Sequence, residues 1–506
     1  MMRKHLFINA LLAVTVCMTT TACFEDETTI GNRPLSEIVL NESSVSDVYN
    51  INKNDVLTIR PVYSQTNGDK PVTITWEIDQ KVYSQEPVLT YTGKELGSWN
   101  CRLILENEDG KTFHPFRLNV NSPYEEGITI LSKDDKGAPY LAFLPTDADG
   151  ARGEFFPYDC LGMNNEDTKF ASYPSDIVQS AGTLIFACQG NGTDNDSPTI
   201  YYINEKTLVV ENILHIKEYD DFKPSILGIP SMDASGVAYP ILCENGKTYE
   251  FSTTEGAIVK PTKFKFDYAQ SMIVRDNGSG WNYEIVVWDK DINALCLIYN
   301  GYGPYYLSYD FDSRGTRSKC VGVNNYFNGF SFCHMTYIRM TKEQGSTNSP
   351  KLLIIVNNGP LYQKATIDTS FWRYNFDTAE TILADNGGKS LASVMNCPLT
   401  ETTPSIANMT YHSLLFADGN KVRRWYYTTS QYVSNADVLL TVGSKDAVIT
   451  GFEMSNDHKR TYVSFYEPNE SGKNGHLWIF DTDNGMITEK YDNISYQPVK
   501  MLYKKK

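Results

Sequence analysis

A recurring hairpin signal constrains this chain more than any other feature of its sequence. A residue pair that tolerates positive φ stands before a run of alternating β-branched or aromatic residues, which is the short-range signature of a tight β-hairpin. The clearest instance is Asn474-Gly475, which precedes the run His476-Leu477-Trp478-Ile479-Phe480. The same kind of signal recurs at turn positions 135, 196, 245, 291, 358, 418 and 474.

The spacing of these turns predicts the architecture of residues 123–506. Consecutive turns stand 46 to 67 residues apart, about 56 on average, with no helical pattern between them. Such a period is typical of one four-stranded antiparallel sheet per repeat, the blade of a β-propeller. We predict seven blades, with the strand Val499–Tyr503 pairing into the first blade and Lys504–Lys506 left as a solvated end. A large sandwich with coincidental hairpins is the alternative.

A separate pattern of short alternating strands occupies residues 36–122. About 85 residues of this kind predict an immunoglobulin-like β-sandwich with Trp76 and Leu103 in its core. The predicted fold class is therefore all-β, with a sandwich followed by a propeller. The alternating stretches are Leu57–Val62, Val72–Ile78, Val88–Tyr91, Trp99–Leu105 and Phe113–Val120.

The start of the chain reads as an export signal. Residues 1–22 begin with Arg3 and Lys4 and continue into the apolar run Leu6–Val16, which is too short to cross a bilayer. Residues 23–35 lack any core-forming periodicity, so we expect a flexible tether to the first domain. No other membrane segment is evident in the sequence.

The residues around the end of this signal resemble those of a bacterial lipoprotein. Small residues precede Cys23, as in a lipobox, whose cysteine thiol is acylated and carries the lipid. The acidic cluster Glu25-Asp26-Glu27 resembles the surface-export signal of Bacteroidota lipoproteins. The resemblance implies an outer-membrane protein at the cell surface that contacts the membrane through its N-terminal lipid alone. A plain secretory signal with an incidental Cys23 is the alternative.

Two segments of the first domain resemble a PKD-like domain. Thr75-Trp76-Glu77-Ile78 and Gly97-Ser98-Trp99-Asn100-Cys101 carry that pattern. With the acylated cysteine, the acidic cluster and the repeated hairpins, the chain resembles the PKD-like family of surface lipoproteins that accompany SusC/SusD-type importers. The resemblance implies a SusC-like TonB-dependent barrel, a SusD-like lipoprotein and other surface lipoproteins as partners. It implies an oligopeptide as ligand, with a glycan as the alternative.

Motifs of catalysis are absent from the sequence. It contains no His-Glu-x-x-His helix, no Gly-x-Ser-x-Gly elbow and no Gly-rich phosphate loop followed by lysine. We therefore expect no catalytic residue, no metal site and no cofactor. A formal charge of −16 repels phosphate backbones and argues against nucleic-acid binding. Two other functions remain open: a surface hydrolase or lyase with acids converging on the propeller funnel, and an adhesion protein.

Several smaller features predict structure. The Asp-rich stretch Asp481–Gly485 has oxygen ligands at alternate positions, as calcium loops do, although turn chemistry explains it. Ser455–Tyr462 partly resembles the Asp-box turn of sialidase-like propellers. Eight cysteines follow Cys23, several in apolar strand contexts, and we expect most to be free buried thiols.

Aromatic residues mixed with Asn, Gly and Ser mark candidate binding segments. Such a composition supplies flat apolar faces and adaptable hydrogen bonds, which suits recognition of peptides, sugars or partner proteins. Part of it must be strand core. The longest interval between turns holds one such segment, and Phe371–Tyr374 holds a second, where an arginine could pair with a carboxylate or stack on a ring. The candidate residues are Tyr302, Tyr305, Tyr306, Tyr326, Phe327, Trp372 and Arg373.

Overall fold

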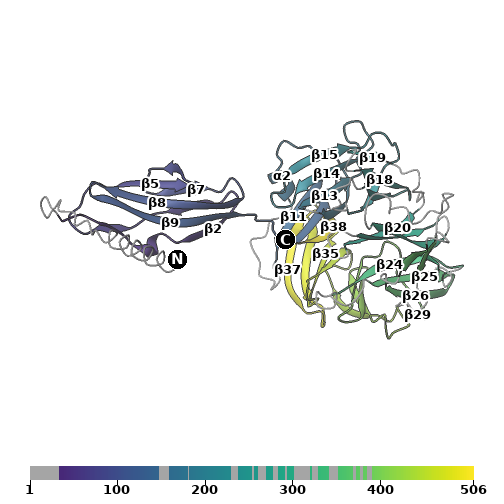
Figure 1. Cartoon of the computed structure of the whole chain (residues 1–506). Helices are drawn as coiled ribbons and strands as arrows, with labels where there is room; N and C mark the ends of the chain where they lie inside the picture. The colour runs from purple at the N-terminus through teal and green to yellow at the C-terminus, as the bar shows by residue number, and fades with distance from the viewer. Residues whose placement is uncertain are drawn as a thin grey trace, which may run out of the picture. The chain divides into compact units, whose positions relative to one another are not determined.

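The computed structural model divides into two compact units, residues 1–121 and 122–506 (Figure 1). The predicted boundary lay one residue later. The structure describes residues 34–505 except 147–158, 181, 230–237, 253–255, 260–268, 277–282, 291–292, 301–319, 322–326, 328, 341–350, 369–371, 376–379 and 384–389.

The first unit is a β-sandwich, as predicted. A five-stranded sheet in the order β2-β9-β8-β5-β6 shares one core with the strand pairs β1-β4 and β3-β7. Parallel pairing of β2 with β9 was not foreseen from the sequence. The elements are β1 (Ile38–Leu40), the 3-10 helix η1 (Glu42–Ser44), β2 (Val48–Asn52), β3 (Val56–Ile59), β4 (Tyr63–Gln65), β5 (Thr73–Ile78), β6 (Lys81–Ser84), β7 (Leu89–Thr92), β8 (Gly97–Asn107) and β9 (Gly110–Asn121).

Trp76 and Leu103 form the centre of the sandwich core. They are cross-strand partners in the β5–β8 ladder, and neither side chain has any exposed surface. The Trp76 indole N–H donates a hydrogen bond of 3.0 Å to the Glu86 carbonyl, so the buried ring leaves no polar atom unpaired. Both predicted core residues are confirmed.

The second unit is a β-propeller whose described strands form seven blades. Blades 5 and 6 merge into one eight-stranded sheet through a short parallel pairing of β24 with β30. The remaining described elements are α2 (Cys160–Met163) and a small sheet of β23 (Cys320–Val321), β27 (Trp372–Asn375) and β28 (Glu380–Leu383).

The blades are as follows, each from its innermost strand outward. Blade 1 has β38 (Gln497–Lys504), β10 (Gly127–Lys133) and β11 (Pro139–Pro145); blade 2 has β12 (Pro174–Ser180), β13 (Thr183–Cys188), β14 (Thr199–Asn204) and β15 (Val210–His215); blade 3 has β16 (Pro224–Leu227), β17 (Ala238–Cys243), β18 (Thr248–Ser252) and β19 (Ala257–Val259); blade 4 has β20 (Ala269–Asp276), β21 (Tyr283–Asp289) and β22 (Ala294–Asn300). Blade 5 has β24 (Ser331–Arg339), β25 (Lys351–Asn358), β26 (Leu361–Asp368) and β29 (Ser390–Val394); blade 6 has β30 (Ser405–Asn408), β31 (Ser413–Asp418), β32 (Lys421–Trp425) and β33 (Asp437–Thr441); blade 7 has β34 (Val448–Met454), β35 (Arg460–Tyr466), β36 (Gly475–Asp481) and β37 (Ile487–Ser495).

The seven predicted turns occupy equivalent places in the ring. Each connects the second and third strands of its blade, from β10–β11 in blade 1 to β35–β36 in blade 7. Because the strands of a blade alternate in direction, these seven connections lie on the same face, which we call the turn face. The last one is longer than predicted: it runs over residues 467–474, and Gly475 already belongs to β36.

The C-terminal strand closes the ring. β38 pairs antiparallel with β10, from Gly127 opposite Lys504 to Lys133 opposite Gln497, and contacts the inner strands β12 and β34 of the two neighbouring blades. Figure 1 shows the yellow end of the chain beside the blue start of this unit. The predicted closure is confirmed.

The predicted solvated end was wrong for Lys504. Pairing continues to this residue, which is only 1% exposed, and its Nζ donates to the Glu125 carbonyl at 2.5 Å. Lys505 donates its backbone N–H to the Gln179 side chain at 2.8 Å. β38 extends to Lys504 because the Glu125 carbonyl and the Gln179 side chain accept the hydrogen bonds that its last residues donate.

Six cysteines with described side chains are buried thiols that form no disulfide, as predicted. They are Cys101, Cys160, Cys188, Cys243, Cys333 and Cys397. Across the described part of the chain, no helix has the length and apolar character needed to span a membrane.

Candidate functional site

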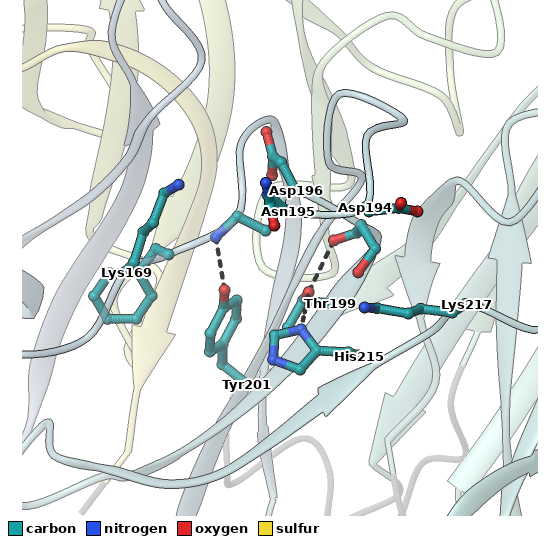
Figure 2. Close-up of a pocket in the computed structure, with 11 residues that line it drawn as sticks. Lys169, Asp194, Asn195, Asp196, Thr199, Tyr201, His215 and Lys217 are labelled. Carbon is teal, nitrogen blue, oxygen red and sulfur yellow. Dashed lines mark hydrogen bonds between the residues drawn. The ribbon is translucent and has the colours of Figure 1, made fainter.

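A pocket of about 200 Å³ opens on the turn face of blade 2 (Figure 2). Three stretches of chain form it: residues 169–171 before β12, residues 194–201 in the β13–β14 connection and the start of β14, and residues 215–217 at the end of β15. All three reach the same face because they precede a first strand, join the second strand to the third, or follow a fourth strand. The repeat therefore brings them together.

Backbone contacts hold the two loops of the pocket against each other. The Ser172 N–H donates to the Asp196 carboxylate at 2.8 Å, and the Gly190 N–H donates to the Ser172 carbonyl at 2.8 Å. Gly190 has φ +67°, and a Cβ there would lie 2.4 Å from the Asp196 carbonyl oxygen, so only glycine fits. The Asp196 carboxylate is thus committed to the loop structure.

Tyr201 forms the floor of the pocket. Its side chain is fully buried and stacks on Phe186, with ring centroids 4.6 Å apart. Its hydroxyl oxygen accepts the Ala171 N–H at 2.6 Å. Burial raises the pKa of Tyr201 well above its ordinary value, so the phenol stays protonated and serves as a structural hydrogen-bonding group.

Thr199 fixes the tautomer of His215. The Thr199 hydroxyl donates to the Ser197 carbonyl at 2.8 Å, and its oxygen lies 3.0 Å from His215 Nδ1. Because the hydroxyl proton is already engaged, Nδ1 is assigned as the N–H donor to Thr199. In the neutral ring, Nε2 is then an acceptor, and His215 lines the pocket.

Four exposed side chains complete the rim, and their polar ends have no hydrogen-bond or ion-pair partner among the described residues. Figure 2 shows one lysine on each side of the floor and Asp194 above the second lysine. The polar groups in the loops and floor of the pocket are hydrogen-bonded within the fold. Its rim, in contrast, presents charges of both signs that have no partner among the described residues. The four rim residues are Lys169, Lys217, Asp194 and Asn195.

A second group of charges lies on the inner strands of the ring. Lys500 of β38 is 3.3 Å from the buried Asp176 carboxylate of β12, which also accepts the Leu227 N–H at 2.9 Å. Asp176 raises the pKa of Lys500 although desolvation opposes the shift, so the amine remains protonated at neutral pH. The Arg339–Glu453 pair, at 2.9 Å, joins blades 5 and 7. These groups lock the ring, and Lys500 does not fit the role of a general base.

The buried histidines have structural partners. His334 Nδ1 lies 2.8 Å from the Thr400 carbonyl and Nε2 lies 2.8 Å from the Ser405 hydroxyl. Burial lowers the pKa of His334, and it lowers that of His458 to about 4. Within the described ranges, no group of three or more potential ligands is placed to hold a metal ion.

The two motifs interpreted as turns are turns. The Asp457 carboxylate accepts the Lys459 N–H at 3.0 Å, and Ser455 bonds to Asp457 at 2.7 Å, between β34 and β35. Asp481 likewise accepts the Asp483 N–H at 3.0 Å, and Gly485 has φ +73°. Turn chemistry accounts for both.

Among the aromatic candidates, Phe327 is the one whose side chain the structure describes. Phe327 is 1% exposed and packs in the blade 4–5 core beside Trp288, 6.3 Å away between ring centroids. Its predicted ligand contact is corrected to a packing role, because the segment carries core residues as well as surface ones. Trp372 and Arg373 lie on β27, whose backbone pairs with β28.

Several predicted residues lie outside the described part of the chain. They are the lipidation residue Cys23, the acidic residues Glu25, Asp26 and Glu27, and the aromatic candidates Tyr302, Tyr305, Tyr306 and Tyr326.

Sequence reasoning identified one wall of the pocket without recognising a site. Asp196-Ser197-Pro198 was interpreted only as a hairpin turn. The other two walls come from the segments before and after the blade, and nothing in the local sequence marks them. The repeat was the sequence feature from which the pocket could have been predicted, because it indicates which connections between strands lie on the same face of the propeller.

Comparisons with known proteins show distant likenesses. The chain matches no protein-family model, and no curated protein matches it. Among solved structures it is similar to a quinonprotein alcohol dehydrogenase-like protein from Bacteroides thetaiotaomicron, with 14% identity, a TM-score of 0.45, and coverage of 93% of this chain and 100% of that one. A DUF4784 family protein from Bacteroides caccae has 9% identity and a TM-score of 0.25, with 91% and 97% covered. Saccharomyces cerevisiae Sqt1 has 10% identity and a TM-score of 0.36, with 75% and 89% covered. Likenesses this distant carry no argument about function.

Proposed function

We propose that this chain is a non-catalytic, lipid-anchored protein of the outer cell surface that binds oligopeptides as an accessory subunit of a SusC/SusD-type importer. Support for the location comes from the lipobox-like Cys23 and the acidic cluster Glu25-Asp26-Glu27. Support for the importer comes from the PKD-like resemblance of the first domain. The observation that carries the binding role is the blade 2 pocket, with its committed frame and uncommitted charged rim.

The chemistry of the pocket favours binding over turnover. Active sites usually hold groups whose pKa values are shifted towards the reaction's needs. Burial raises the pKa of Tyr201, so its phenol stays protonated at neutral pH and is not available as a base or nucleophile. The lysines and Asp194 are solvent-exposed and suited to ionic and hydrogen-bonded contacts with a ligand.

The size of the pocket favours one end of a chain molecule as its occupant. Pockets that enclose a whole drug-sized ligand measure about 300–1,000 Å³, and this one measures about 200 Å³. A single terminal residue of a longer polymer suits that volume, with the rest of the polymer extending into solvent. A capture role for an importer uses such partial, reversible contact.

The test is purification of the chain from outer membranes in mild detergent. The tag follows Lys506 through a flexible linker, because Lys504 is buried in the closing strand. We expect a SusC-like barrel and a SusD-like lipoprotein to co-purify in fixed ratio. The control is a Cys23→Ser chain, which cannot be acylated and should be lost from the outer membrane. Recovery of the wild-type chain alone from a confirmed surface location would contradict the accessory role.

A further inference from the structure

We propose that the blade 2 pocket recognises the C-terminal carboxylate of an oligopeptide. This inference rests on the proposed binding function and names the part of the ligand that the pocket receives. It follows from which side chains of the pocket are occupied by the fold and which remain available.

The available cations select an anionic group. Lys169 and Lys217 approach the pocket from opposite sides (Figure 2), and neither ammonium has a partner among the described residues. Charge-assisted hydrogen bonds from an ammonium to a carboxylate are stronger than neutral ones. Asp194 supplies a nearby negative charge, which disfavours ligands that carry several anionic groups. A ligand end with a single carboxylate satisfies both conditions.

The neutral groups of the rim match a peptide bond. His215 Nε2 is an acceptor, because Nδ1 donates to Thr199, and it can receive the last backbone N–H of a peptide. The Asn195 amide offers both a donor and an acceptor to the adjoining peptide group. A carboxylate and its neighbouring amide therefore find complementary partners on one rim.

The aromatic rings of the pocket are poorly placed for a sugar. A pyranose needs an exposed aromatic face against which its C–H groups can pack. Tyr201 is fully buried, and the half-buried Phe170 packs against Phe186 and Tyr201 with ring centroids 6.0 and 5.1 Å away. The rings stabilise the pocket floor, which leaves recognition to the charged rim.

The experiment measures binding of the full mature chain, in detergent, to two alanine- and glycine-containing pentapeptides by isothermal titration calorimetry. One peptide has a free C-terminal carboxylate and the other has a C-terminal amide. We expect the amide to bind about tenfold more weakly, as the loss of a charged hydrogen-bond partner predicts. A glucuronate oligosaccharide is the third probe, because it offers carboxylates from a different source.

Charge variants supply the sign test. Lys169→Gln and Lys217→Gln should each weaken binding of the free-acid peptide, whereas Asp194→Asn should strengthen it. The matched control is Lys445→Gln, since Lys445 lies in the connection between β33 and β34, is 88% exposed and pairs only with the neighbouring Asp446.

Four results would each overturn the inference. They are equal affinity for the acid and the amide, no binding of either peptide, tighter binding of the glucuronate oligosaccharide, and weaker peptide binding by Asp194→Asn. The proposed association with the importer would remain a separate question, because the membrane purification tests it without reference to the peptide terminus.

Discussion

The closing strand β38 and the blade 2 pocket use the same residue types for different purposes. The strand uses them to stabilise the fold, and the pocket presents them to a ligand. At the closing strand, Lys500 pairs with the buried Asp176, and the Tyr503 hydroxyl donates to Glu126 at 2.6 Å. In the pocket, Lys169, Lys217 and Asp194 stand exposed without partners among the described residues. The first arrangement pairs these polar groups within the fold, and the second leaves charges available to a ligand.

The difference shows how to separate stability from recognition in this propeller. A polar group with a buried partner costs free energy when the partner is removed, because the remaining group stays desolvated. A solvent-exposed charge without a partner costs almost nothing to replace. We therefore expect variants at the closing strand to change folding, and variants at the rim to change binding alone.

Removal of residues 497–506 should have the largest effect. The truncation deletes β38, exposes the inner strands beside it and removes the buried side chains Met501 and Tyr503. We expect the propeller to lose roughly 5 kcal/mol or more of stability, by analogy with large cavities. Circular dichroism should show a missing or strongly lowered propeller transition. The sandwich, with its own core around Trp76, should keep its transition; an unchanged propeller transition would contradict the closure.

Tyr201→Phe should have the next largest effect. The variant removes the hydroxyl that accepts the Ala171 N–H and leaves that buried donor unpaired. We expect a loss of about 2 kcal/mol, within the usual cost of such a group. Peptide affinity should also fall, since residues 169–171 would no longer be held over the floor. Denaturant unfolding and calorimetry on the same preparation check both results. A loss of stability without a loss of peptide affinity would contradict the role of Tyr201 in positioning the binding site.

Asp176→Asn should produce a smaller and pH-dependent effect. The amide oxygen can still accept the Leu227 N–H, but the attraction to Lys500 is lost. The 49% exposure of the Lys500 side chain lets water screen the pair, so we expect about 1 kcal/mol.

The pH profile of this variant has a definite sign. Asp176 raises the pKa of Lys500 above 10.5, so the folded state holds this proton more tightly than the unfolded state. The stabilisation is fully present below about pH 10.5 and is lost as the pH rises through the raised value. Thermal melts should show the full difference between wild type and Asp176→Asn at pH 9 and a smaller difference as the pH rises above about 10.5. A constant difference would contradict the ion-pair account.

The double variant Lys169→Gln/Lys217→Gln should have the smallest effect on folding. Both side chains are exposed and unpartnered among the described residues, so the free energy of unfolding should change by less than about 0.5 kcal/mol. Denaturant midpoints measure this directly. A larger loss would mean that the lysines support the fold, which would remove the distinction between rim and frame.

The sequence predicted the ring better than the site, for a physical reason. The hairpin turns at residues 245, 358 and 418 are local signals, and each lies between the second and third strands of its blade. Trp76 was likewise identifiable from one alternating strand. The pocket depends on Lys169, Asp194 and Lys217, which stand on three separate connections and carry no shared motif.

The corrections have the same origin. Phe327 and Lys504 were both assigned to the surface from their local sequence, one as a ligand contact and the other as a solvated end. Phe327 packs beside Trp288, and Lys504 donates to the Glu125 carbonyl, 379 positions away in the chain. Local composition does not reveal partners that the packing of adjacent blades or the closure of the ring brings together.

The most direct test of the binding site is hydrogen-exchange mass spectrometry of the full mature chain with and without a saturating free-acid peptide. We expect slower exchange confined to residues 169–173, 190–199 and 215–217, with no change in the sandwich or in β38. Protection elsewhere, or none in these three segments while the peptide is bound, would contradict the assignment of the site to blade 2.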